Sequence, residues 1–107
     1  MNESDVLDRL MAQLQRRVAD RPANSYTTKL LEGGVDAITA KVREEAEEVI
    51  EAASMPTKEQ LLYEACDLIY HLWVLLAAAG IDVDDVRREL ARREGTSGIA
   101  EKASRKK

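Results

Sequence analysis

Glycine, proline and aromatic residues are scarce in this chain, which has five Gly, two Pro, one Trp, three Tyr and no Phe among 107 residues. A β-sandwich needs frequent turns and many β-branched or aromatic side chains, so this composition excludes one. Hydrophobic residues nevertheless make up 45% of the chain, which is too apolar for a disordered segment. At this length, the sequence predicts a single all-α domain.

Cysteine is nearly absent, since Cys66 is the only one. A lone cysteine forms no intramolecular disulfide, and it excludes a cysteine-based metal centre. Cys66 lies within an apolar helical segment, where we expect a small buried side chain.

Long hydrophobic runs, targeting signals and excess positive charge are also missing. The longest apolar stretch, residues 72–81, is about half as long as a membrane span. The N-terminus shows neither the basic region nor the apolar run of a signal peptide, so we expect a cytoplasmic protein without a membrane partner. The net charge of −4 lacks the basic footprint of a nucleic-acid binder, so no nucleic-acid partner is expected.

Hydrophobic periodicity and breaker residues divide residues 1–94 into helices that we expect to form one domain. The first is expected to begin at Asn2 or Ser4 and to stop before Pro22. Thr57 and Gln60 have the spacing of a capping box. The other predicted helices cover residues 25–31, 35–53, 58–79 and 82–94. Residues 95–107 are polar, small and finally basic, and we expect them to form a mobile basic tail.

Acidic residues border the apolar face of the predicted helix over residues 35–53. Projected at 100° per residue, Glu45 falls within about 70° of the apolar stripe. Glu48 lies on the flank of the same face and Glu44 lies just beyond it. Glu47 and Glu51 point the opposite way, toward solvent.

The predicted helix over residues 58–79 repeats this pattern. Glu64 and Asp67 are three residues apart, and together with Gln60 and His71 they project within about 60° of one another. Burying an unpaired carboxylate costs several kcal/mol or more, so these acids must be paired, protonated or coordinated.

The two acidic borders are expected to meet, because helices joined by a short connection pack as antiparallel neighbours. Carboxylates that converge in this way repel one another unless a cation lies among them. Their hard oxygen atoms favour Mg²⁺, or Mn²⁺, over zinc. Salt bridges to Lys29, Lys41 or Arg43 are the structural alternative.

The spacing E-E-x-x-E, fifteen residues, E-x-x-D resembles the signature of the all-α nucleoside-triphosphate pyrophosphohydrolases. Within that superfamily, S-Y-T-T-K-L at residues 25–30 and D-L-I-Y-H at residues 67–71 resemble the phosphoribosyl-ATP pyrophosphatase family of histidine biosynthesis. The resemblance extends over residues 6–93. Arg43 and Cys66 depart mildly from the family pattern, since a Gly and an Ala are usual there.

The resemblance implies a reaction, the Mg²⁺-dependent hydrolysis of 1-(5-phosphoribosyl)-ATP to 1-(5-phosphoribosyl)-AMP and pyrophosphate, which is the second step of histidine biosynthesis. It implies catalytic acids that hold the metal, with Glu44 as a further ligand or as the residue that activates water. The metal ligands are Glu45, Glu48, Glu64 and Asp67. The residues implied in substrate binding are Lys29, Lys41, Ser25, Tyr26, Thr27, Tyr70 and His71.

The resemblance also implies an antiparallel helical bundle that is completed by homodimerisation. A physical argument agrees, because the remaining helices cannot fully cover a 22-residue helix that is apolar over much of its circumference. Two other functions stay open. One is a related housekeeping (d)NTP pyrophosphohydrolase, which shares the acidic motif but lacks S-Y-T-x-K-L. The other is a non-enzymatic helical dimerisation module, which predicts no stabilisation by Mg²⁺.

Overall fold

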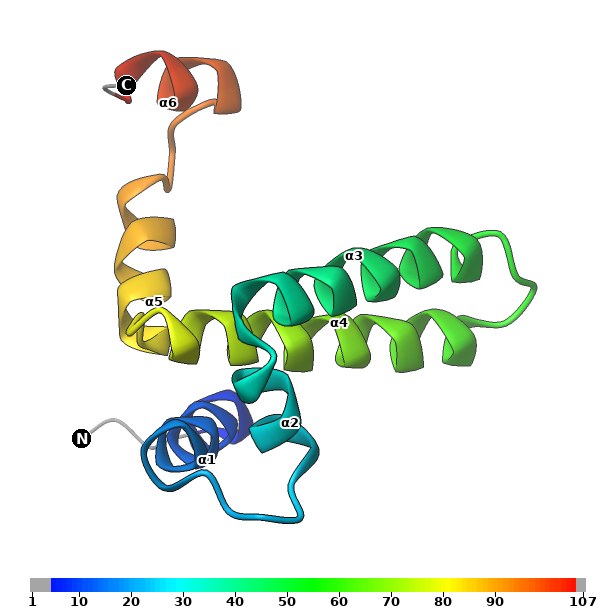
Figure 1. The fold of residues 1–107 in the computed structure, drawn as a ribbon. Coiled ribbons are helices and arrows are strands. Elements are labelled where there is room, and N and C mark those ends of the chain that lie inside the picture. The colour runs from blue at the N-terminus through cyan, green and yellow to red at the C-terminus, as the bar shows by residue number, and fades with distance from the viewer. Residues whose placement is uncertain (1–4, 106–107) are drawn as a thin grey trace.

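The computed structural model describes residues 5–105, and within them the chain forms helices and no strand (Figure 1). The all-α prediction is therefore confirmed for this part of the chain. The expected caps Asn2 and Ser4 lie outside the described residues. The helices are α1 (Val6–Asp20), α2 (Tyr26–Glu32), α3 (Gly34–Ala52), α4 (Lys58–Ala78), α5 (Val83–Arg92) and α6 (Gly98–Ser104).

Side-chain caps fix several helix starts. Asp5 accepts hydrogen bonds from the first turn of α1, and Asp8 accepts one from the backbone of Asp5, which completes a capping box. The capping box predicted at Thr57 is wrong, because Thr57 precedes α4 without a side-chain bond to it. Gln60 instead donates to Oε2 of Glu64 at 3.1 Å.

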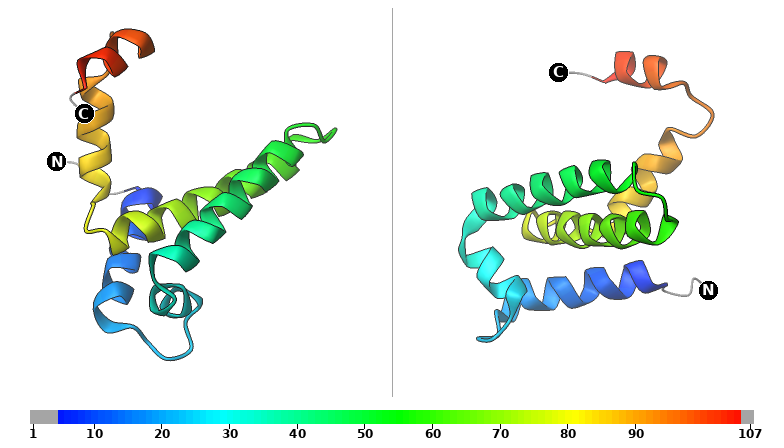
Figure 2. Two further views of the ribbon diagram at one scale, coloured as in Figure 1. Left: turned by 45° about the horizontal axis from the view of Figure 1, so that its top comes forward. Right: turned by 90° about the vertical axis from the view of Figure 1, so that its right-hand side faces the viewer.

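α3 and α4 lie side by side as an antiparallel hairpin, as expected, and α1 packs against the C-terminal half of α4 (Figures 1 and 2). α2 packs against α1 and α3 and hydrogen-bonds to α4. The core forms where these helices meet. Trp73 of α4 reaches across it and donates a hydrogen bond to the Leu7 carbonyl of α1. The buried apolar residues of this cluster are Met11, Leu14, Leu30, Leu31, Ile38, Trp73, Val74, Ala77 and Val83.

The N-terminal half of α4 pairs with α3 but has no cover from α1 (Figure 1). An apolar surface is left there, which we call the outer α4 face and define as Leu62, Cys66 and Ile69. Leu62 is 60% exposed and Ile69 is 37% exposed. Cys66 is exposed too, so the expectation of a buried side chain is wrong. The physical reason is that α1 packs against the other half of α4, where Trp73 bonds to the Leu7 carbonyl, and leaves this half with α3 alone.

α4 is also the one described helix that is long and apolar enough to cross a membrane by length and composition. It carries Glu64 and Asp67 near its middle, and an ionised side chain at the centre of a bilayer has an unfavourable free energy. It also packs against α1 and α3. We therefore interpret α4 as the core helix of the bundle.

The segment expected to be a tail contains a helix, α6, that was not predicted from the sequence. Ser97 caps it by accepting from the Ala100 amide at 3.1 Å. Glu101 is only 4% exposed, because Arg92 of α5 and Arg105 pair with its carboxylate. Residues 98–104 therefore form a short helix that ion pairs stabilise. The boundary at residue 94 and the mobility of residues 95–107 stay predictions, and residues 106–107 lie outside the described part.

Candidate functional site

The structure brings the acids of α3 and α4 together between the two helices. Carboxylate oxygens of Glu44, Glu45 and Glu48 lie within 4.8 Å of one another, and so do those of Glu45, Glu64 and Asp67. Glu45, which is shared by both groups, is 6% exposed. Ligands on opposite sides of an octahedral Mg²⁺ are about 4.2 Å apart, so these spacings suit a divalent cation. The role of the five residues as metal ligands stays a prediction.

One lysine balances part of this negative charge. Nζ of Lys41 lies 3.1 Å from Oε1 of Glu44 and 3.3 Å from Oε2 of Glu45. The hydrogen bond to Glu44 raises the pKa of Lys41, which therefore stays charged. The salt-bridge alternative is thus realised at Lys41. Among residues 5–105, neither Lys29 nor Arg43 forms an ion pair with the acids.

Glu48 and Glu64 have no cationic side chain paired with them among the described residues. Burial and then the charge of Glu45 raise the pKa of Glu48 above its ordinary value, and Glu64 adds to the effect. Oε1 of Glu64 is buried and has no hydrogen-bond partner among the described residues. A buried carboxylate oxygen without a partner is destabilising. Both features are consistent with a site in which a bound cation would balance the negative charge of the carboxylates.

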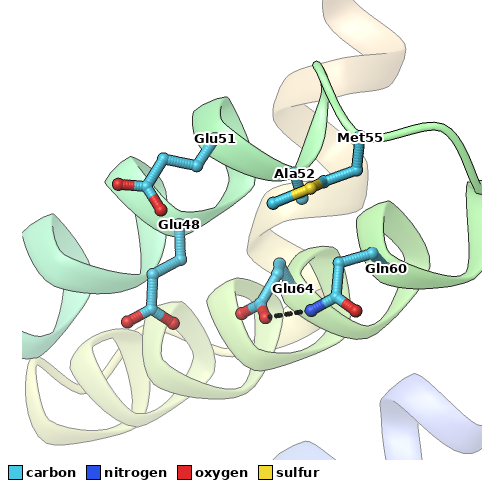
Figure 3. Close-up of a pocket in the computed structure, with 6 residues that line it drawn as sticks. All are labelled: Glu48, Glu51, Ala52, Met55, Gln60 and Glu64. Carbon is cyan, nitrogen blue, oxygen red and sulfur yellow. Dashed lines mark hydrogen bonds between the residues drawn. The ribbon is translucent and has the colours of Figure 1, made fainter.

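A pocket of about 200 Å³ opens beside Glu48 and Glu64 at the end of the hairpin. Figure 3 shows their carboxylates turned toward the same space between α3 and α4. Glu51, which the helical projection directed toward solvent, also lines this pocket. The signal that could have found it is its position three residues after Glu48. The lining residues are Glu48, Glu51, Ala52, Met55, Gln60 and Glu64.

Aromatic side chains adjoin the acids where α2 crosses α4. Oη of Tyr26 lies 2.7 Å from Nε2 of His71, and Nδ1 of His71 lies 2.8 Å from the Asp67 carbonyl oxygen. Oγ1 of Thr27 lies 2.6 Å from Oη of Tyr70. Burial raises the pKa of Tyr26, and the charge of nearby Lys41 opposes that shift. Four of the residues implied in substrate binding therefore form one cluster beside Asp67.

One residue of this cluster also serves the fold, and Ser25 and Lys29 lie apart from it. Thr27 is fully buried and also accepts from Arg17 of α1 at 3.3 Å. Ser25 caps α2 by accepting from the Thr28 amide. The Lys29 side chain is exposed and forms no hydrogen bond within residues 5–105. Arg17 has no local sequence signal for this contact, because it lies on a different helix from Thr27.

Comparisons with known proteins agree on one family. A family model described as phosphoribosyl-ATP pyrophosphohydrolase matches residues 7–94, which include α2, α3 and α4 entirely. A phosphoribosyl-ATP pyrophosphatase of Rhodopirellula baltica is 61% identical over 102 residues, covering 92% of this chain and 85% of that protein. One from Trichlorobacter lovleyi is 52% identical over 101 residues, covering 94% of each. The histidine biosynthesis bifunctional protein HisIE of Wolinella succinogenes is 46% identical over 101 residues, covering 94% of this chain and 44% of that protein.

Proposed function

The chain belongs to the phosphoribosyl-ATP pyrophosphohydrolase family, and from that membership we propose its reaction. It is a hydrolase of a phosphoanhydride. The substrate is 1-(5-phosphoribosyl)-ATP, the products are 1-(5-phosphoribosyl)-AMP and pyrophosphate, and the reaction depends on Mg²⁺, with Mn²⁺ as a substitute. The protein acts in the cytoplasm, in the second step of histidine biosynthesis.

The observation that carries this proposal is the presence of two clusters of three carboxylates each, with Glu45 as a member of both. Glu45, Glu48, Glu64 and Asp67 would hold the metal. When bound, a divalent cation offsets charge between carboxylates and phosphates and polarises phosphoryl oxygens. Glu44 is the more exposed partner of Lys41, and we assign it to a further ligand or to the orientation and deprotonation of water.

The substrate is strongly anionic, and its phosphates need positively charged partners. The site itself has an excess of acidic side chains, so few such partners are present. Lys41 lies at the edge of the carboxylates. Lys29, on the preceding helix α2, is exposed. These two lysines are the proposed phosphate contacts. Tyr26, Tyr70 and His71 form the aromatic wall beside them, in line with a nucleotide ligand.

A homodimer is the proposed working form. The outer α4 face leaves Leu62 and Ile69 in solvent, and exposed apolar surface of this kind marks an association site. The radius of gyration of 15.9 Å also exceeds the value of about 13 Å for a compact chain of this length. A second copy packed against α4 would cover the apolar residues and complete the bundle.

A product assay tests the reaction. The protein is incubated with 1-(5-phosphoribosyl)-ATP, with dCTP and with dUTP in the presence of Mg²⁺, and pyrophosphate and orthophosphate are measured separately. We expect pyrophosphate from the phosphoribosyl substrate, loss of activity with EDTA, and recovery with added Mg²⁺ or Mn²⁺. Hydrolysis of the deoxynucleotides alone would instead identify a housekeeping pyrophosphohydrolase. Neither hydrolysis nor stabilisation by Mg²⁺ would identify a dimerisation module.

A further inference from the structure

His71 is buried at 7% exposure, and both of its ring nitrogens have partners. The partner of Nδ1, at 2.8 Å, is the carbonyl oxygen of Asp67, which can only accept a hydrogen bond. Nδ1 must therefore carry the hydrogen. In a neutral imidazole the other nitrogen then accepts, so the hydroxyl of Tyr26, 2.7 Å from Nε2, is the donor.

The ring of His71 is held on its sides as well as at its nitrogens. Its plane stands nearly perpendicular to the ring of Tyr26, with centroids 5.7 Å apart, and to the ring of Tyr70, with centroids 5.3 Å apart. This packing leaves the imidazole little access to solvent. A group enclosed in this way acts on a ligand through its neighbours.

α2 is bound to α4 at two adjacent positions. Tyr26 pairs with His71, and Thr27 pairs with Tyr70, so consecutive residues of one helix meet consecutive residues of the other in reverse order. Arg17 donates to the same Thr27 oxygen and adds α1 to the assembly. The start of α2 therefore has one fixed position relative to the acid-bearing turn of α4.

Tyr26 is the member of this cluster that faces outward, at 48% exposure. Through His71 its hydroxyl is linked to the backbone of Asp67, one of the acids of the carboxylate clusters. Burial raises the pKa of Tyr26, so the phenol keeps the proton that it donates to His71. Its ring is the part of the cluster that a bound nucleotide can touch.

We propose that His71 is a positioning residue that acts through Tyr26: as an Nδ1–H imidazole, it fixes the Tyr26 side chain beside the carboxylates for contact with the nucleotide. The role rests on the proposed function, because it concerns the binding of that substrate. It differs from the direct substrate contact implied for His71 by the family resemblance.

The first test is spectroscopic and needs no substrate. His71 is the only histidine of the chain, so untagged ¹⁵N-labelled protein gives one set of imidazole nitrogen signals. At neutral pH we expect a protonated Nδ1 and an unprotonated Nε2, and Tyr26→Phe should shift the Nε2 signal because it loses its donor. A hydrogen on Nε2, or an Nε2 signal unchanged by Tyr26→Phe, would overturn the proposal.

The second test is kinetic. His71→Asn keeps a donor near the position of Nδ1 but removes the acceptor for Tyr26, whereas His71→Gln keeps an acceptor near Nε2. We expect Tyr26→Phe and His71→Asn each to raise KM about five- to tenfold, the worth of one hydrogen bond, with kcat retained. The double variant should be no worse than either single one, and His71→Gln should stay near the wild-type KM.

Loss of folded enzyme would lower kcat and leave KM unchanged, which separates positioning from a purely structural role. Tyr63→Phe is the matched control, because Tyr63 is 60% exposed and its hydroxyl has no partner within residues 5–105. A wild-type KM in His71→Asn, or additive effects in the double variant, would contradict the proposal. If the wild type releases no pyrophosphate, the proposed function fails, while the hydrogen-bond arrangement is still decided by the nitrogen spectra.

Discussion

Glu45 is the residue on which the site depends most. It is the one buried member of the five acids, it belongs to both carboxylate groups, and Lys41 is its ion-pair partner at 3.3 Å. A buried carboxylate keeps its charge only where nearby cations stabilise it. Glu45 is therefore the acid for which replacement by an uncharged isostere should change metal binding most.

We expect Glu45→Gln to lower the Mg²⁺-dependent activity by about 100-fold or more, because an amide is a weaker ligand for a hard cation. The increase in melting temperature that Mg²⁺ gives the wild type should vanish in this variant. Glu47→Gln is the control, since Glu47 lies on the exposed side of the same helix. Full activity and full Mg²⁺ stabilisation in folded Glu45→Gln would contradict the assignment of the site.

Single residues were predictable from the sequence where one helix decides their position. The projection of α3 distinguishes Glu45 from Glu47, and the structure agrees, because Glu45 is buried and Glu47 is exposed. The apolar neighbours of Cys66 gave the wrong expectation, because its exposure depends on which part of α4 the other helices cover. Contacts between helices, such as Tyr26 with His71 across 45 positions, have no local signal.

At the scale of the element, α6 is a helix that ion pairs of Glu101 stabilise. Arg105 and then Arg92 hydrogen-bond to Glu101 and lower its pKa to about 2. Arg92 and Arg93 lower the pKa of Glu89 of α5 to about 2 in the same way. Arg92, which pairs with both glutamates, thereby joins α6 to the end of α5.

Acid should therefore release α6. The folded pKa of Glu101 lies below its ordinary value of 4.5, so its stabilising contribution is complete above about pH 4.5 and disappears as the pH falls toward 2. Amide exchange of residues 98–104, followed by NMR from pH 5 to pH 2, measures this. Glu101→Gln should give fast exchange already at pH 5, while Glu94→Gln, a change at an exposed acid that has no ion pair within residues 5–105, should not. Equal protection in wild type and Glu101→Gln would contradict this account.

The long helices and the short α2 were predictable from the sequence, whereas α6 was not. α3 and α4 carry an apolar stripe over several turns, so their periodicity defines them. α6 has seven residues, and its ion pair with Arg92 comes from another helix. The Thr57 cap was wrong because Gln60 is used by Glu64.

At the scale of the whole molecule, the chain is extended. α5 and α6 project from the α3–α4 hairpin, and the N-terminal half of α4 has α3 alone beside it (Figure 2). The sequence predicted an exposed apolar surface on this helix from the shortage of covering helices. Its location on the N-terminal half required the structure, since α1 could equally have packed there.

The proposed dimer gives a direct prediction. Light scattering of the wild type should give twice the chain mass of 11.9 kDa, whereas Leu62→Glu should give the mass of one chain, because a charge in the outer α4 face opposes burial. Val35→Glu is the control, as Val35 is similarly exposed at 63% but lies on α3. A monomeric wild type at micromolar concentration would contradict the dimer.

The uncovered outer α4 face makes folding depend on the number of chains present. In the proposed assembly, part of the apolar surface that stabilises each chain is supplied by another chain, so folding and association form one equilibrium. Mass action then acts on the fold itself, and dilution destabilises the protein much as a mild denaturant would. Each tenfold rise in chain concentration should raise the melting temperature, and the amount of chain that a cell makes becomes one of the conditions for its stability.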